Sequence, residues 1–166
     1  MGRREGTVVC PGSYDPVTNG HLDIITRTSS VFRRVVVGVV NNPIRKQKTL
    51  FTAEERRGFI EEATTDLENV EVQIFSNLLV EFARELEATA IVKGLRAISD
   101  FEYEFEMAQL NRKLDPTIES IYVIASAHYS FLSSTGVKEM ATFKGDVSDL
   151  VPGPVAAAMA ERLGDR

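Results

Sequence analysis

Cysteine is nearly missing from this 166-residue chain, in which Cys10 is the single example. A disulfide framework within the chain is therefore impossible, and such cysteine usage suits a reducing cytosol. Histidine is scarce too, with two residues in all. Because zinc sites draw mainly on cysteine and histidine, we expect no dedicated zinc site. Cys10 lies in strand-like sequence with no adjacent base evident, so we do not expect it to act as a nucleophile.

Long apolar runs and an excess of positive charge are also missing. No apolar run approaches the roughly 20 residues of a membrane-spanning helix. The polar residues 1–6 lack the apolar centre of a signal peptide. Nineteen basic and 24 acidic residues give a net charge of −5, which predicts no general attraction to nucleic acid. We therefore expect a cytoplasmic protein with neither a membrane nor a nucleic-acid partner.

Apolar and amphipathic segments alternate along the whole chain. Short runs rich in Val and Ile predict strands over 7–10, 35–40, 70–75, 90–92 and 121–125. Helical patterns follow near 21–31, 53–65, 78–88, 100–113, 133–143 and 154–164, the second opening on a capping box of Thr52 and Glu55. This alternation predicts an α/β fold: a single Rossmann-like domain over residues 1–166, with a five-stranded parallel sheet and helices on both faces.

In such sheets ligands bind beyond the carboxyl ends of the strands, so the loops that follow the strands are the candidate site. The first loop and the helix start after it read "CPGSYDPVTNGH", residues 10 to 21. Pro11-Gly12 ends the strand, Ser13 offers a hydroxyl, and the Asp15-Pro16 pair could fix the turn. The loop is either a simple connection or a cradle for phosphates.

The helix that follows this loop favours the cradle. Thr18 or Asn19 could cap it, which leaves Gly20 and His21 in its first turn. Free backbone N–H groups at a helix start favour a bound anion, and a histidine there can donate to a phosphate oxygen. The alternative interpretation of His21 is a solvent-exposed side chain.

Cations and hydroxyls gather on three of the other loops. The loop 41–51 contains Arg45, Lys46 and Lys48, and such a run is usually a solvated loop. Lys93 and Arg96 flank Gly94, which suits either a phosphate clamp or ion pairs to the acidic residues at 100–106. Hydroxyls crowd a later helix start at Ser130, Ser133, Ser134 and Thr135. Between these loops, Leu78, Leu79 and Phe82 have the helical spacing of core residues.

Together these groups indicate a polyphosphate ligand at one edge of the sheet. The sequence has no P-loop signature and no G-x-G-x-x-G motif, so the phosphates would be held in another way. Fold-level reasoning alone identifies no reaction.

Three segments, taken in order, resemble one enzyme family. Thr18-Asn19-Gly20-His21 matches the (T/H)-x-G-H signature of the nucleotidylyltransferase superfamily, and "SSTGVKE" at 133–139 is similar to its second signature. "VKGLRAISDFEYEFEMAQLNRKL" at 92–114 resembles the bacterial phosphopantetheine adenylyltransferase family. The resemblance covers roughly residues 7 to 163. It implies transfer of AMP from ATP to 4′-phosphopantetheine with Mg²⁺, in a cytoplasmic homohexamer that coenzyme A inhibits by feedback.

The resemblance also implies roles for single residues. Ser13, His21, Lys46 and Arg96 take the catalytic positions, and His21 is the residue that stabilises the transferring phosphate. Ser13, Lys46, Lys93 and the backbone of Leu79 take positions that bind 4′-phosphopantetheine. Further ATP-binding positions, beside Ser13, His21 and Arg96, are Tyr14, Gly94, Leu95, Glu104, Tyr129, Ser130, Phe131, Leu132, Ser133, Ser134 and Thr135.

Some assignments stay open. The segment from Pro43 to Phe51 is longer than the family pattern, so Arg45 or Lys48 is an alternative to Lys46. No acidic cluster suggests a metal cage, and we expect Mg²⁺ mainly on ATP phosphates and water. The rival functions are another nucleotidylyltransferase, using nicotinate mononucleotide or a polyol phosphate with CTP, and a non-catalytic nucleotide-binding module.

Overall fold

Five parallel strands form one sheet in the order β3-β2-β1-β4-β5. The structure is a computed structural model, which describes residue 2 and residues 4–44 and 48–164. The strands are β1 (Arg4–Gly12), β2 (Phe32–Val40), β3 (Val70–Phe75), β4 (Ala88–Leu95) and β5 (Glu119–Ile124). The chain runs outward from β1 to β3 and then crosses to β4 on the other side of β1, so the order reverses between β1 and β4.

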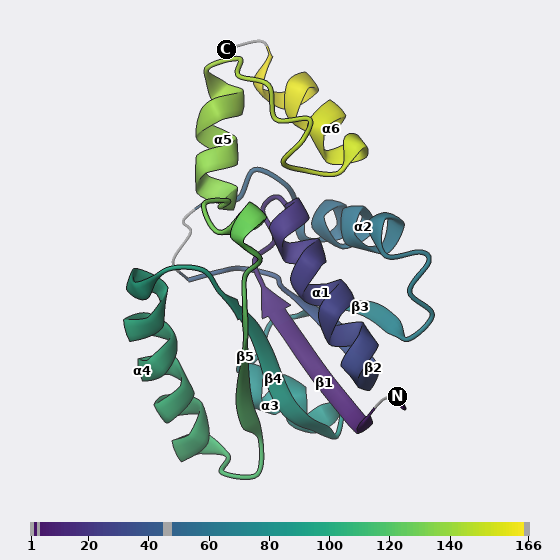
Figure 1. The fold of residues 1–166 in the computed structure, drawn as a ribbon, viewed down its shortest axis with the longest axis vertical. Helices are drawn as coiled ribbons and strands as arrows, with labels where there is room; N and C mark the ends of the chain where they lie inside the picture. The colour runs from purple at the N-terminus through teal and green to yellow at the C-terminus, as the bar shows by residue number, and fades with distance from the viewer. Residues whose placement is uncertain (1, 3, 45–47, 165–166) are drawn as a thin grey trace.

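The predicted helices are present between and after these strands (Figure 1). They are α1 (Asn19–Val31), α2 (Ala53–Ala63), α3 (Leu79–Glu85), α4 (Ile98–Leu114), α5 (Ser134–Thr142) and α6 (Gly153–Leu163). A short 3-10 turn, η1 (Ala127–Tyr129), was not predicted. Within the residues that the structure covers, no helix combines the length and the apolar character needed to cross a bilayer.

Helices cover both faces of the sheet, as the sequence predicts. Because side chains alternate along a strand, Val8 and Val9 enter two different buried clusters. Val8 packs with Ile25 of α1, and Val9 packs with Val80 of α3. Figure 1 shows α1 and α3 on opposite sides of the sheet and α5 and α6 beyond its carboxyl end.

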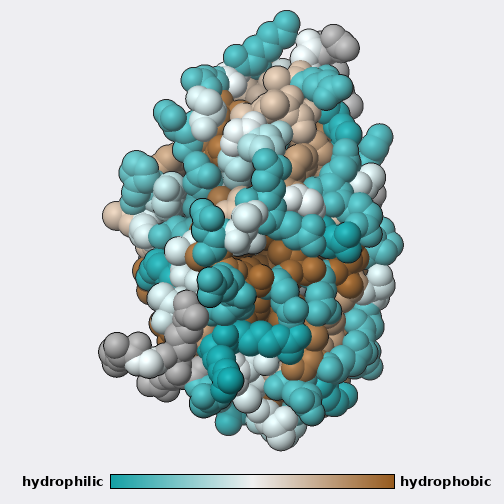
Figure 2. Space-filling view, turned by 90° about the vertical axis from the view of Figure 1, so that its right-hand side faces the viewer, coloured by the Kyte–Doolittle hydropathy of each residue, from teal (hydrophilic) through white to brown (hydrophobic). Residues whose placement is uncertain are grey.

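The side of the molecule that carries α2 faces the reader in Figure 2, where hydrophilic side chains cover most of the surface. Apolar surface shows between them near the middle of this face. The expectation that Leu78 belongs to the core is wrong, because it is 53 % exposed ahead of α3, while Leu79 and Phe82 pack into the second cluster.

Gly38 on β2 gives a test of how tightly the second cluster is packed. A Cβ atom there would lie 2.8 Å from Phe82 Cε1 and 3.1 Å from Phe75 Cε1. We expect Gly38→Ala to lower the free energy of unfolding by about 1–3 kcal/mol, because both rings must shift. The matched variant Gly58→Ala places its methyl group in open space on α2. It should be neutral or stabilising by up to about 1 kcal/mol in the same urea titration. Equal effects of the two variants would contradict this packing.

Candidate active site

A cavity of about 310 Å³ opens at the carboxyl end of the sheet, where the loops after β1 and β4 diverge. This is the position at which doubly wound sheets bind their ligands. Its walls contain most of the predicted site residues: Ser13, Tyr14, His21, Lys93, Gly94, Arg96, Tyr129, Leu132, Ser133, Ser134 and Thr135. Segments far apart in the sequence thus meet around one cavity, as the sequence analysis expected.

His21 is held by the first turn of α1. Thr18, rather than Asn19, is the N-cap, and its hydroxyl accepts from the backbone N–H of His21. In return, the Thr18 backbone N–H donates to Nδ1 of His21 at 3.0 Å, which completes a capping box. Because a backbone N–H can only donate, Nδ1 carries a lone pair, and a neutral imidazole has its proton on Nε2. The ring therefore presents a donor from Nε2.

Tyr14 supports this ring from the first loop. Its ring meets that of His21 edge-on, with the centroids 5.0 Å apart, and its hydroxyl donates to the Cys10 carbonyl at 2.9 Å. Tyr14 adopts a φ of 48°, which packs it against Gly12, where a Cβ atom would lie 3.0 Å from the ring. Burial raises the pKa of the Tyr14 hydroxyl well above its usual range. It also raises the pKa of the Cys10 thiol to about 12, so this cysteine stays protonated near neutral pH.

Two cations, Lys93 near the end of β4 and Arg96 directly after it, line the cavity and also form ion pairs. Lys93 Nζ lies 2.7 Å from Glu104 Oε2, and Arg96 Nε lies 3.1 Å from Asp100 Oδ2. Arg96 also donates from Nη1 to the Leu132 carbonyl at 2.7 Å, which ties the loop after β4 to the loop before α5. A phosphate clamp and ion pairs to acidic residues of α4 were the two interpretations of these cations. They are compatible, because the carboxylates hold both cations at the cavity wall.

Other predicted residues lie elsewhere in the part of the chain that the structure describes. Leu95 and Glu104 line a separate groove beside α4, and Glu104 reaches the cavity only through Lys93. Leu79 packs against the core, Ser130 donates to the Ala127 carbonyl, and Phe131 is 70 % exposed. Arg45 and Lys46 lie outside the described residues, whereas Lys48 is described and exposed.

Comparison with known proteins decides the family. Residues 9–140 match the family model of cytidylyltransferase-like proteins, a range that contains all three signature segments. A phosphopantetheine adenylyltransferase of Rubrobacter xylanophilus is 56 % identical over 144 residues, covering 87 % of this chain and 87 % of that protein. The one of Heliobacterium modesticaldum is 51 % identical over 157 residues, covering 95 % and 92 %. That of Alkaliphilus metalliredigens is 50 % identical over 154 residues, covering 93 % and 97 %.

The chain belongs to the phosphopantetheine adenylyltransferase family. The resemblance in the sequence is thereby confirmed, and with it the nucleotidyltransferase class. The roles of single residues remain predictions, which the geometry allows to be stated atom by atom.

Two charged residues of this family member escaped the sequence analysis. Asp15 was considered only as half of a turn pair, yet its carboxylate is 0 % exposed and accepts from two backbone N–H groups of the loop 41–51, the second loop. Arg56 is 1 % exposed, whereas the adjacent Arg57 pairs with Glu54 and Glu61 on the surface. Nothing in the run "EERR" distinguishes the buried arginine from the exposed one.

Proposed function

We propose that this chain transfers the adenylyl group of ATP to 4′-phosphopantetheine, giving dephospho-coenzyme A and pyrophosphate, the penultimate step of coenzyme A biosynthesis. One observation carries the proposal. In this member of the family, one cavity lies where the strand order reverses between β1 and β4, and it is lined by His21, Lys93, Arg96 and a set of hydroxyls. The hydroxyls are those of Ser13, Tyr129, Ser133, Ser134 and Thr135.

The reaction requires positioning and charge stabilisation more than proton transfer. An oxygen of the acceptor phosphate attacks the α-phosphorus of ATP, the bond from that phosphorus to the bridging oxygen breaks, and pyrophosphate leaves with the electron pair. The acceptor is a phosphate monoester whose second pKa is about 6, so it is largely dianionic near neutral pH. A general base therefore has no proton to remove, and the site acts by bringing two anions together.

Each predicted site residue has a part in the proposed scheme. His21 donates from Nε2 to an oxygen on the α-phosphorus, where negative charge builds up in the transition state. Arg96 binds the ATP phosphates, and Lys93 binds the acceptor together with Ser13 and Lys46. The segment from Tyr129 to Thr135 receives the adenosine, and the Leu79 backbone contacts the pantetheine arm.

Magnesium enters this scheme with the nucleotide. The described residues that line the cavity include no carboxylate, and no group of three possible metal ligands occurs among the residues that the structure covers. This side-chain set does not fit a protein-held Mg²⁺. We therefore propose that the ion is bound by ATP phosphate oxygens and water.

Release of pyrophosphate with different acceptors tests the proposal against its rivals. Purified protein is incubated with Mg²⁺ and ATP plus either 4′-phosphopantetheine or nicotinate mononucleotide, and separately with CTP plus a polyol phosphate. We expect release only with 4′-phosphopantetheine. Release with another acceptor would move the chain to a different nucleotidylyltransferase reaction. ATP binding with no release in any mixture would favour a non-catalytic nucleotide-binding module.

We further propose a cytoplasmic homohexamer with coenzyme A as a feedback ligand, as the family resemblance implies. The physical support for assembly is the exposure of α4, on which none of the residues 100–114 is buried. Four large apolar side chains of this helix are about half exposed: Phe101, Phe105, Leu110 and Leu114. Apolar area of this kind is typical of a surface that another protein covers.

We expect light scattering at micromolar concentration to give the mass of six 18.4 kDa chains. Phe105→Glu should reduce that mass, because it places a charge on the apolar face of α4. Phe143→Glu is the matched control, since Phe143 is exposed at the end of α5. A monomeric wild type, or dissociation by the control alone, would contradict assembly through α4.

A further inference from the structure

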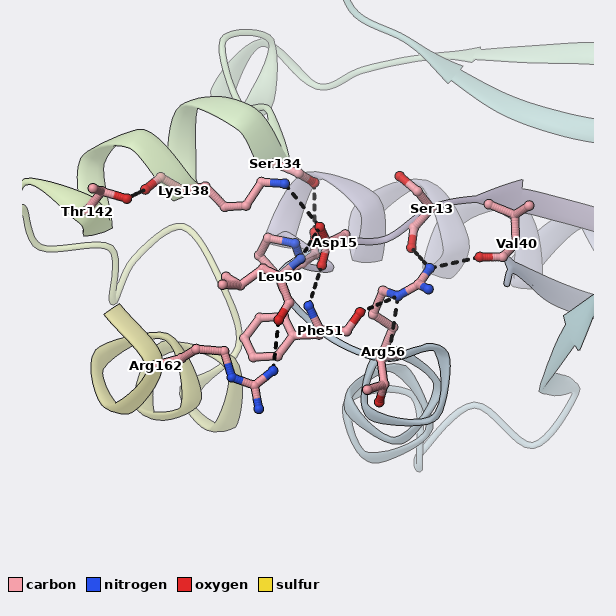
Figure 3. A network of polar contacts seen from close by, with 12 residues as sticks. Ser13, Asp15, Val40, Leu50, Phe51, Arg56, Ser134, Lys138, Thr142 and Arg162 are labelled. Atoms are coloured by element: carbon pink, nitrogen blue, oxygen red, sulfur yellow. Dashed lines mark hydrogen bonds and ion pairs between the residues drawn. The ribbon is translucent and has the colours of Figure 1, made fainter. Parts of the chain in front are cut away.

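Leu50 and Phe51, at the end of the second loop, are held by charged side chains from three other parts of the chain (Figure 3). Asp15 accepts from both backbone N–H groups: Leu50 N donates to Oδ2 and Phe51 N to Oδ1, each at 2.9 Å. The Leu50 carbonyl accepts from Arg162 of α6 at 2.8 Å, and the Phe51 carbonyl accepts from Arg56 of α2 at 3.1 Å. All four backbone polar groups of this irregular dipeptide thus bond to charged side chains.

The Phe51 side chain anchors the same point. It is 1 % exposed, stacks edge-on with Phe59 at a centroid distance of 5.1 Å, and lies under the Arg162 guanidinium at 4.9 Å. The hydrogen bonds of the Phe51 backbone are buried as well, so charged side chains satisfy polar groups that water does not reach. These contacts therefore fix the position of the dipeptide.

Arg56 ties the other end of the second loop to the first loop. Its Nη1 donates to the carbonyls of Ser13 and Val40, and its Nη2 donates to the carbonyl of Asn41, at 2.7–2.9 Å. Asp15 lies two residues after Ser13. Both ends of the second loop are therefore fastened to the loop that carries the predicted catalytic hydroxyl.

Asp15 also reaches the second signature segment. Lys138 of α5 lies 3.0 Å from Asp15 Oδ2, and the Ser134 hydroxyl donates to the Pro16 carbonyl at 2.7 Å. One buried carboxylate thus connects the second loop to the first loop and to α5, both of which contribute residues to the cavity wall.

We propose that Asp15 is a positioning residue for adenylyl transfer. It sets the second loop, through Leu50 and Phe51, in register with Ser13 and His21, so that the two substrates meet in line. This inference rests on the proposed function. A displacement of about 1 Å at such a site is enough to slow a reaction about 100-fold without any loss of a group that touches substrate.

Asp15→Asn tests the proposal because it keeps the size of the side chain and replaces an acceptor by a donor. We expect kcat for dephospho-coenzyme A formation to fall about 10- to 100-fold. The amides of Leu50 and Phe51 should exchange hydrogen about tenfold faster or more, measured without substrates. Asp66→Asn, in the exposed turn after α2, makes the same chemical change and should alter neither quantity.

Two further variants separate the contributions. Lys138→Met leaves in place both hydrogen bonds that the backbone N–H groups of Leu50 and Phe51 donate to Asp15. The kcat of this variant should therefore fall less than that of Asp15→Asn. Arg162→Met removes the exposed hydrogen bond to the Leu50 carbonyl. Its kcat should fall in proportion to the increase in the hydrogen-exchange rate of the Leu50 amide. It also keeps the proposal testable if Asp15→Asn does not fold.

Several results would overturn the positioning role. One is a folded Asp15→Asn, or Arg162→Met, that exchanges faster at Leu50 and retains the wild-type kcat. Another is a Lys138→Met as slow as Asp15→Asn with unchanged exchange, because Lys138 itself would then be the acting group. If the wild type forms no dephospho-coenzyme A, the proposed function fails and the positioning role falls with it. A defect that is present only in the variants leaves the proposed function standing.

Discussion

His21→Ala is expected to lower kcat by about 10²- to 10³-fold, the cost of removing one donor aimed at a developing oxyanion. The affinity for ATP should change much less, because the contact from Nε2 strengthens only as charge builds on the phosphoryl oxygens. Raising the pH should not restore turnover, since the variant has lost a donor and no deprotonation step. A pH–rate profile beside calorimetric ATP binding measures both quantities.

His21→Asn is the matched control for the helix cap. Its side-chain oxygen can take the place of Nδ1 and accept from the Thr18 backbone N–H, while nothing replaces Nε2. We expect the kcat of His21→Asn to be as low as that of His21→Ala. The Asn variant should nevertheless retain about 1 kcal/mol of the free energy of unfolding that the Ala variant loses with the helix cap. Recovery of the Ala variant at high pH would favour a general base, and lost ATP affinity with intact kcat would make His21 a binding residue only.

Arg96→Ala and Lys46→Ala should damage the reaction by different routes. Each loses a charge-assisted contact worth roughly 1.5–3 kcal/mol, which corresponds to about 10- to 150-fold. For Arg96 we expect the loss mainly in the KM for ATP. For Lys46, which we propose to contact the acceptor phosphate and the transferring group, we expect the loss in kcat and in the KM for 4′-phosphopantetheine.

Steady-state kinetics with each substrate varied in turn separates the two routes. Arg57→Ala, which removes a surface arginine of α2, is the control for loss of one positive charge. Arg96→Lys keeps the charge and loses the fork that reaches both Asp100 and the Leu132 carbonyl, so it should recover only part of the affinity. A normal Lys46→Ala with an inactive Lys48→Ala would show that the register assigned to the second loop is wrong.

The strands followed from the sequence where Val and Ile recur at strand spacing. β3 occupies the predicted residues 70–75, in which Val70, Val72 and Ile74 alternate with polar residues before the run ends at Ser76. β2 begins at Phe32, before the predicted Val35. Arg33 and Arg34 are strand residues whose charges are paired with Glu5 and Glu71, so that this end of the strand looks like a loop in sequence.

Side-chain patterns located the cavity wall but not the framework behind it. Ser13, His21 and Arg96 were identifiable because each carries its chemistry in its own side chain at the end of a strand or the start of a helix. Asp15 and Arg56 act on backbone groups of other loops, and a backbone amide or carbonyl has no residue type to recognise. Such partners emerge only when the topology brings the loops together.

The fate of the acceptor phosphate tests the central claim most directly. The protein is incubated with Mg²⁺, ATP and 4′-phosphopantetheine whose terminal phosphate is labelled with ¹⁸O, and the products are weighed by mass spectrometry. The account predicts dephospho-coenzyme A that contains all of the label, and unlabelled pyrophosphate, because the acceptor oxygen attacks the α-phosphorus. Label in the pyrophosphate, or no dephospho-coenzyme A at all, would contradict it.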